Sequence, residues 1–381
     1  MVEGARLESV YRGNSIAGSN PALSAITLFK FQKNFLIFLN YYIMNICIFY
    51  TSPKLGDIIL QLPFIKAISN YYKTKVVLCI NSHIKIKNIL ENQEYISNII
   101  ENPFRRGSSF IKDVLKLKRD LNREKINYAF ILEKTKGPAI ACKLAGIKKI
   151  YGFGIGSQKY LVSRSVRLNK NDLRYNYTEQ SIRFLDSLNI PYNFKDKFIS
   201  LKKNSSDFIK TYQNLPKPWV CFAVDSTEIN RIWPQENFAK LADKLFEKNL
   251  AKTIFVINHE EHKKYFQEIS KNSKYQGQLI DCKSLDRSQI IHLIDVCEFF
   301  VGIDSGPSCV AGALDKKTFC IIGPTDATLP RFNSIIKITS EIYDKNREVG
   351  IYRCGDNFIQ NDSEVKTISV SKVFNTIVEN L

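Results

Sequence analysis

The sequence predicts an α/β protein of two domains, each built on a parallel sheet covered by helices. Two observations carry this prediction. The chain of 381 residues is longer than one hydrophobic core usually organises, and short apolar runs alternate with amphipathic helical stretches in two rounds. Runs that are apolar throughout are typical of strands buried on both faces of a parallel sheet. Pro216 and Pro218 separate the two rounds. We therefore expect two facing Rossmann-like domains, at 44–200 and 201–381, with a cleft between them.

Strands and helices are expected to alternate along both halves. In the first half, strands are expected at 46–50, 76–80, 128–132 and 149–153, and helices at 57–72, 108–123, 137–145 and 178–188. In the second half, strands are expected at 219–224, 253–257, 299–303 and 318–322, and helices at 234–249, 260–270, 288–296 and 307–313. The last helix of the chain is expected to stay with the second domain or to pack back on the first. Ligands of open α/β sheets bind beyond the carboxyl ends of the strands, so the corners from strand to helix are the places to look for chemistry.

The basic composition narrows the classes of partner. The formal net charge is +18 at pH 7, and a basic protein can bind nucleic acid, an anionic membrane or a phosphorylated substrate. The lysines and arginines are spread along the chain rather than gathered in blocks, so we expect no nucleic acid partner. The 9 cysteines include no CxxC pair, which favours reduced thiols in the cytoplasm. His259 and His262 lack an HExxH pattern and a third ligand, and we expect neither a metal nor another cofactor.

Residues 1–43 differ in character from the rest and are expected to lie outside the folded protein. The run Gly-Ser-Asn-Pro at 18–21 is what the T-arm sequence common to transfer-RNA genes encodes. One hypothesis is that a transfer-RNA gene is read through in frame here, with Met44 as the physiological start; the alternative is a disordered leader. The apolar stretch 35–50 is shorter than the roughly 20 residues of a membrane-spanning helix, and its second half is expected to be a buried strand.

The corner after the first expected strand carries a carboxylate. Gly56 permits a tight turn, and Asp57 follows it at the start of an apolar helix. An aspartate at such a place is commonly the N-cap of the helix, and spacing alone favours that role. The functional interpretation makes Asp57 a carboxylate that faces the cleft and acts as a general base. Both interpretations stay open at this point.

Two corners in the second half suit phosphate groups. Ser226 and Thr227 follow a strand, and Arg231 precedes the next helix, so hydroxyls and a guanidinium would meet an anion there. Later, the run Asp-Ser-Gly at 304–306 turns from a strand into a helix of small residues, whose free amides and dipole favour a diphosphate. Either corner alone would be ordinary for an α/β sheet, but the corners together on one edge predict an anionic ligand.

The stretch 111–125 is expected to form a helix with a basic face. Its charged residues are Lys112, Lys116, Lys118, Arg119 and Arg123. Such a face is most often simply solvated, and docking on an anionic membrane is the alternative.

At these corners the chain resembles the ADP-heptose:lipopolysaccharide heptosyltransferases of glycosyltransferase family nine, over roughly residues 45–335. The motifs are Gly-Asp after the first strand, a basic residue spaced from Trp-Pro before the first helix of the second half, and Asp-Ser-Gly-Pro followed later by Gly-Pro-Thr-Asp. Each is modest alone, but their order and spacing are fairly specific. The resemblance implies a GT-B fold, metal-independent transfer with inversion at the sugar, and a donor held by the second domain.

The resemblance also implies roles for single residues. Asp57 falls at the proposed base of the family, and Glu260 or Glu261 at a carboxylate that contacts the donor ribose. The other positions implied to bind the donor are Ser226, Thr227, Arg231, Asp304, Ser305, Gly306, Cys309 and Thr325. Cys309 stands where the family usually has His, and a thiol cannot supply the same imidazole contact.

From these roles we expect an inverting glycosyltransferase that moves a heptose or a related sugar from a nucleotide-diphosphate donor, with an ADP-sugar favoured. The expected acceptor is a phosphorylated glycolipid or another surface glycan, as in lipopolysaccharide biosynthesis. The protein is expected in the cytoplasm, and peripheral contact with the inner face of an anionic membrane is a further expectation. Two other functions on the same fold stay open: a non-catalytic sugar-nucleotide-binding protein and a nucleotide-sugar epimerase.

Overall fold

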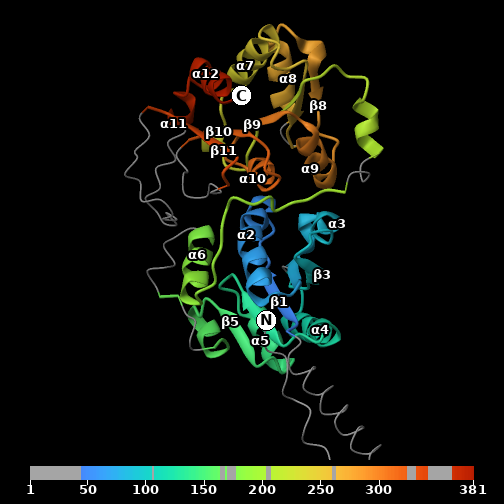
Figure 1. Cartoon of the computed structure of the whole chain (residues 1–381), viewed down its shortest axis with the longest axis vertical. Helices are drawn as coiled ribbons and strands as arrows, with labels where there is room; N and C mark the ends of the chain where they lie inside the picture. Colours follow the sequence, from blue (N-terminus) through green and yellow to red (C-terminus); the bar gives the residue numbers. More distant parts are fainter. Residues whose placement is uncertain are drawn as a thin grey trace, which may run out of the picture. The chain divides into compact units, whose positions relative to one another are not determined.

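Figure 1 shows the chain as a computed structural model. It describes residues 44–381 apart from 105–106, 164–167, 170–176, 203–206, 260–262, 324–331 and 342–362. Residues 1–43, including the tetrapeptide at 18–21, lie outside the described part. Among the helices of the described part, none combines the length and the apolar composition needed to span a bilayer.

The first half contains a sheet of five parallel strands in the order β3-β2-β1-β4-β5. The strands are β1 Ile46–Tyr50, β2 Val76–Asn81, β3 Ile96–Asn102, β4 Tyr128–Ile131 and β5 Lys149–Gly152. The chain moves outward in one direction from β1 through β2 to β3, and then returns to the other side of β1 as β4. The topological switch point of this sheet therefore lies between β1 and β4.

The second half repeats this plan with six parallel strands in the order β11-β10-β9-β6-β7-β8. They are β6 Trp219–Ala223, β7 Thr253–Ile257, β8 Leu279–Asp281, β9 Phe299–Ile303, β10 Thr318–Ile322 and β11 Ile335–Thr339. Here the switch point lies between β6 and β9, which pair directly.

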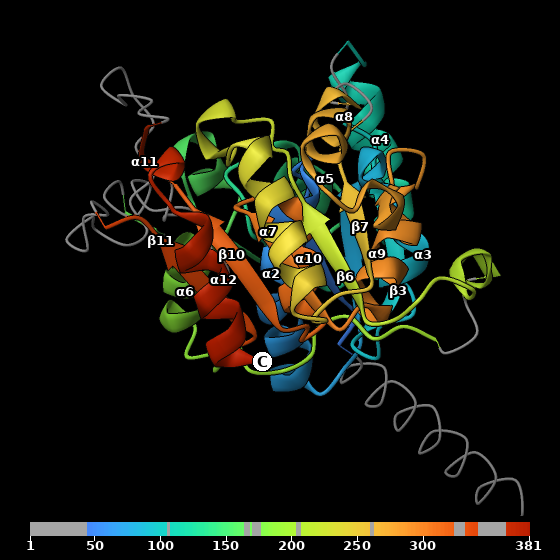
Figure 2. The ribbon, with the colours of Figure 1, turned by 90° about the horizontal axis from the view of Figure 1, so that it is seen from above.

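Helices follow the strands along both halves. The first half has α2 Leu55–Tyr72, α3 Lys87–Leu90, α4 Phe110–Arg123, α5 Gly137–Leu144 and α6 Tyr177–Ser187. The second half has α7 Gln235–Glu247, α8 Lys263–Asn272, α9 Arg287–Val296, α10 Gly306–Ala313, α11 Ser363–Lys366 and α12 Val370–Asn380. Figures 1 and 2 show these helices around the two sheets. Both expected parallel sheets with helical covers are therefore present.

Alternation along the strands decides which helices cover which face. In the first sheet, Cys47 and Phe49 lie in one cluster with the buried faces of α4 and α5. Tyr50 points to the opposite face and packs edge-on against Tyr177 of α6. In the second sheet, Phe222 belongs to the core that α7, α8 and α12 cover.

The structure differs from the sequence prediction in three respects, the first being two short helices, α3 and α11, that were not expected. Three strands were not expected, namely β3, β8 and β11, and all three lie at or near the margins of the sheets. The last helix, α12, buries Val373 and Ile377 in the core of the second half and packs against α7. The expectation that α12 packs back on the first domain is therefore wrong. The apolar side of α12 is already occupied by the sheet that precedes it in the chain.

Candidate functional site

The two switch points gather the candidate residues. In the first sheet, Thr51 follows β1 and Glu133 lies just beyond β4, the strand that pairs directly with β1. In the second sheet, the corner at 225–231 follows β6, and the turn at 304–306 follows β9. Parallel neighbours end at the same edge, so in each sheet the two corners stand side by side. This is the position where open α/β sheets bind their ligands.

Asp57 lies in the first turn of α2, but it is not the N-cap. Lys54 holds that position, without a side-chain cap, so the N-cap interpretation is wrong. The hydroxyl of Ser52 donates to Asp57 Oδ2 at 2.5 Å, which orients the half-buried carboxylate. Burial raises the pKa of Asp57, while the Ser52 hydrogen bond and the charges of Lys54 and Arg231 oppose the rise. A carboxylate with a raised pKa that is still partly open to solvent is suited to accept a proton.

Glu133 is a second carboxylate at this edge, and the sequence analysis missed it. It is buried, at 9% exposure, and its Oε1 accepts from the hydroxyl of Thr51 at 2.7 Å. Its Oε2 accepts from the Thr51 amide at 3.3 Å. Burial raises the pKa of Glu133, and the hydrogen bonds from Thr51 and Thr135 oppose the rise. Through Thr51, Glu133 holds the start of the loop that leads to Asp57. A glutamate directly after an apolar strand is the one signal by which the sequence could have revealed it.

Arg231 and Asp304 meet across the second switch point. A guanidinium nitrogen of Arg231 lies 3.3 Å from Asp304 Oδ2 and also contacts the Asp304 carbonyl at 3.4 Å. Asp304 is buried, whereas Arg231 keeps part of its side chain exposed. Arg231 Nε and Ser305 Oγ are buried, and neither has a hydrogen-bond partner within the described residues. Buried donors without partners are costly, so this corner has unused capacity for an acceptor such as a phosphate oxygen.

The two hydroxyls after β6 differ. Ser226 is buried, and its Oγ accepts from the Glu228 amide at 3.2 Å, so it shapes the loop. Thr227 is exposed. Before them stands Asp225, which the sequence analysis did not single out. This buried carboxylate accepts from the His259 amide at 2.6 Å and lies 3.0 Å from His259 Nδ1, which ties the loop after β7 to this corner.

Three predicted donor residues lie outside the described part of the chain. They are Glu260, Glu261 and Thr325. His259, which hydrogen-bonds to Asp225, is the last described residue before Glu260. The structure therefore describes the start of the loop after β7 but neither glutamate.

The beginnings of α2 and α10 come into contact, which joins the two sets of corners. A Cβ atom added at Gly56 would lie 3.3 Å from the Cα of Gly306 and 3.5 Å from Cys309 Sγ. Burial raises the pKa of Cys309 well above its ordinary value; the charges of Asp304 and Asp57 raise it further, and Arg231 opposes them. Cys309 is therefore a neutral thiol against the first turn of α2. Asp57, Arg231 and Asp304 are all close enough to act on it electrostatically.

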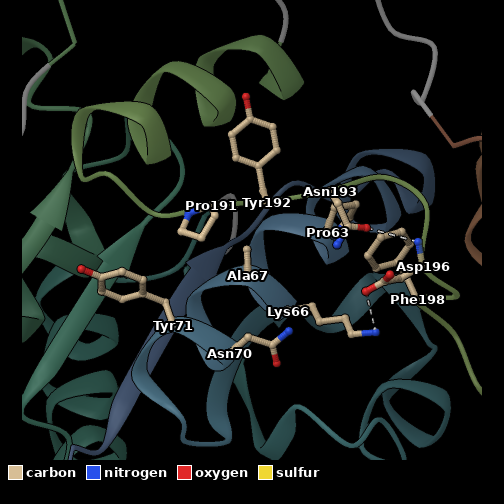
Figure 3. A pocket seen from close by; sticks show the side chains of 10 residues that line it. All are labelled: Pro63, Lys66, Ala67, Asn70, Tyr71, Pro191, Tyr192, Asn193, Asp196 and Phe198. Carbon is tan, nitrogen blue, oxygen red and sulfur yellow. Dashed lines mark hydrogen bonds and ion pairs between the residues drawn. The ribbon is translucent and has the colours of Figure 1, made fainter.

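The features away from these corners give less support for a binding site. No group of three metal-ligating side chains gathers among the residues that the structure describes. Figure 3 shows a hollow of about 310 Å³ on the later turns of α2 and the segment 191–198. There Lys66 pairs with Asp196 at 3.1 Å and lies over the Phe198 ring. None of the predicted site residues lines this hollow.

Comparison with known proteins places this arrangement in a family. The family model described as glycosyltransferase family 9 (heptosyltransferase) matches residues 114–349. No curated protein sequence matches the chain.

Solved structures of such enzymes share the fold. ADP-heptose lps heptosyltransferase II of E. coli is 16% identical, with a TM-score of 0.69 over 88% of this chain and 98% of that one. A family 9 glycosyltransferase of Veillonella parvula is 15% identical, with a TM-score of 0.69 over 88% and 96%. The E. coli heptosyltransferase WaaC with ADP-2-deoxy-2-fluoro heptose is 15% identical, with a TM-score of 0.63 over 89% and 100%. The fold is therefore GT-B, and since the family model covers more than half of the sequence, the chain belongs to glycosyltransferase family 9 and is a glycosyltransferase.

Proposed function

We propose that the protein transfers a heptose or a related sugar, with inversion, from a nucleotide-diphosphate donor to a phosphorylated glycolipid of the lipopolysaccharide type at the cytoplasmic face of a membrane. The observation that carries the proposal is the contact between Gly56 and Gly306. It sets a half-buried carboxylate, Asp57, opposite a corner that holds Arg231 and the start of α10. An ADP-sugar is the favoured donor because solved WaaC structures hold ADP or an ADP-heptose analogue.

The second half would bind the diphosphate. The Ser305 side chain caps no amide of α10, so the amides of Gly306 and Ser308 are the ones offered to phosphate oxygens; Pro307 has no N–H, and the Cys309 amide donates to the Ser305 carbonyl at 3.3 Å. The Ser305 hydroxyl and Arg231 Nε are the buried donors that lack partners within the described residues. Asp304 holds the guanidinium in place from the opposite side. Positive charge at this position stabilises the diphosphate as it leaves, which is where negative charge grows in the transition state.

The first half would supply the base. Asp57 takes the proton of an acceptor hydroxyl, the acceptor oxygen forms a bond to the anomeric carbon, and the bond from that carbon to the diphosphate breaks. The electron pair of the broken bond leaves with the diphosphate. Attack from the face opposite the leaving group inverts the anomeric carbon. Ser52 keeps the carboxylate oriented, and Glu133 steadies the loop through Thr51.

Two substitutions in the full chain test the proposal. Asp57→Asn is expected to leave donor binding intact and to lower transfer by about 100-fold or more, the usual share of a general base. Arg231→Ala is expected to weaken donor binding as well, measured as the rise in melting temperature on adding ADP-heptose. Asp186→Asn, on the exposed side of α6, is the matched control and should change neither quantity.

The outcomes separate the two halves of the proposal. Full transfer activity in the Asp57→Asn protein would refute the assignment of the base. Unchanged donor binding in the Arg231→Ala protein would refute the assignment of the diphosphate site.

A further inference from the structure

The outer side of α4 carries basic and apolar side chains together. The helix packs on the first sheet through Val114, Leu117 and Leu121. The residues on its solvent side define what we call the α4 face: exposed basic Lys112, Lys116, Arg119 and Arg123, and exposed apolar Phe110, Ile111 and Leu115. Ile111 is 71% exposed, and Leu115 and Phe110 are 47% and 43% exposed. Single exposed apolar residues are common, but three within six positions of one helix form a patch.

Among the described residues, the positive charge of the α4 face is paired only at Arg123. Asp113 accepts from Ser108, Asp120 pairs with Arg123 at 3.1 Å, and Glu124 lies 3.8 Å from Arg123. Within the described residues, Lys112, Lys116 and Arg119 form no ion pair. An anionic surface would therefore meet unpaired cations on this face, with apolar side chains beside them.

The apolar end of the α4 face lies at the edge of the sheet that carries the site. Phe110 begins α4, which follows β3, and its ring packs 5.6 Å from that of Phe104. Lys136 lies over the Phe110 ring at 6.0 Å, and it stands in the corner after β4, three residues beyond Glu133. Helices that follow parallel strands begin at the carboxyl edge of the sheet, which is also the edge of Asp57. α4 and α5 pack on the same face of the first sheet and contact each other.

We propose that the α4 face docks on an anionic lipid surface, with Ile111 and Leu115 inserted among the headgroups. A surface helix with a basic side and bulky apolar residues is the form in which proteins lie in a membrane interface. Lipid is the occupant that matches both halves of the face, because its phosphates meet the lysines while its acyl boundary covers the apolar side chains. The inference rests on the proposed function, since a lipid-anchored acceptor would then be presented at the edge that carries Asp57.

Vesicle co-sedimentation of the full chain tests the inference. The vesicles are phosphatidylcholine alone, and phosphatidylcholine mixed with phosphatidylglycerol. Each Lys or Arg near an anionic membrane strengthens binding about fivefold, so the triple variant K112Q/K116Q/R119Q should bind the anionic vesicles about 100-fold more weakly. The variant I111Q/L115Q should also bind more weakly, although it keeps every charge. All five substituted residues are exposed, so neither variant is expected to unfold.

A second triple variant controls for total charge. K240Q/K248Q/K271Q removes the same charge from exposed positions on α7, at its end and on α8, and should bind the anionic vesicles nearly as the unchanged protein does. Equal losses in the two triple variants, or no binding of the unchanged protein to anionic vesicles, would overturn the inference. So would equal binding of I111Q/L115Q and the unchanged protein. The melting-temperature rise with ADP-heptose is measured on every variant. This rise should be equal in every variant and in the unchanged protein. If the unchanged protein shows no rise, that result counts against the proposed function and not against the α4 face.

Discussion

A methyl group at Gly56 tests whether the contact between α2 and α10 exists in the working enzyme. In the Gly56→Ala protein the added Cβ would lie 3.3 Å from the backbone Cα of Gly306, inside the roughly 3.5–4.0 Å of an ordinary carbon contact. Backbone atoms cannot rotate away, so the two helix starts must separate by a few tenths of an ångström. Asp57 is the next residue and moves with them. Because a misplacement of about 1 Å can cost about 100-fold in rate, this shift should lower kcat/KM by about 5- to 10-fold.

Stability should change little, which separates a loss of activity from a loss of folding. Gly56 is the second residue of α2, and its backbone is not in the left-handed region, so alanine fits the helix. The lower entropy of the unfolded chain should contribute about 0.4–1 kcal/mol, and the separation of the two helix starts should offset a similar amount, so the net change in the free energy of unfolding should stay within about 1 kcal/mol. Transfer kinetics and urea unfolding of Gly56→Ala are compared with Gly277→Ala, where an added Cβ meets no atom within 4 Å. Full activity in Gly56→Ala would show that the two helix starts do not meet during catalysis.

Three further predictions each rest on the surroundings of one residue. A general base acts in its ionised form, and burial raises the pKa of Asp57. As the pH is lowered, kcat/KM should therefore begin to fall at a higher pH than it would if the base were an exposed aspartate; a pH–rate profile checks this. Trp233→Phe removes the indole donor to the Ile368 carbonyl, at 2.9 Å, and should lower the free energy of unfolding by about 1–3 kcal/mol in urea titration. Gly312→Ala would drive a methyl group into the Phe332 ring and should cost about 1–3 kcal/mol by the same assay; an unchanged midpoint would contradict the packing of α10.

The fold was predictable where strands are buried on both faces. The expected strands at 46–50, 253–257, 299–303 and 318–322 coincide with β1, β7, β9 and β10, all fully buried. The strands that escaped prediction lie at the margins, where one side of a strand has no partner. β3 mixes buried with exposed and half-buried residues, and β8 has only three residues. A strand at the edge of a sheet does not need a continuous apolar run, so its sequence lacks the signal on which the prediction depended.

The site was predictable only in its local part. The residues that carry motifs, such as Asp57 and Arg231, stand at corners that the alternation of strands and helices already marks. Glu133 and Asp225 carry no motif, because their roles come from partners far away in the sequence. Glu133 accepts from Thr51, 82 residues earlier, and Asp225 holds His259, 34 residues later. Only the pairing of neighbouring strands brings such residues together, and a periodic pattern does not encode that pairing.

The electrostatics at the start of α10 argue for an anion beside it. Each helix begins at the positive end of its dipole, and here α2 and α10 begin in contact through Gly56 and Gly306. Two positive ends at this distance repel each other unless negative charge lies beside them. α2 carries Asp57 in its first turn, whereas α10 has no acidic residue in its first turn and no side-chain cap. The negative charge of Asp304 next to α10 is engaged by Arg231. The start of α10 therefore remains short of negative charge, and a diphosphate bound there would supply it while placing the sugar beside Asp57.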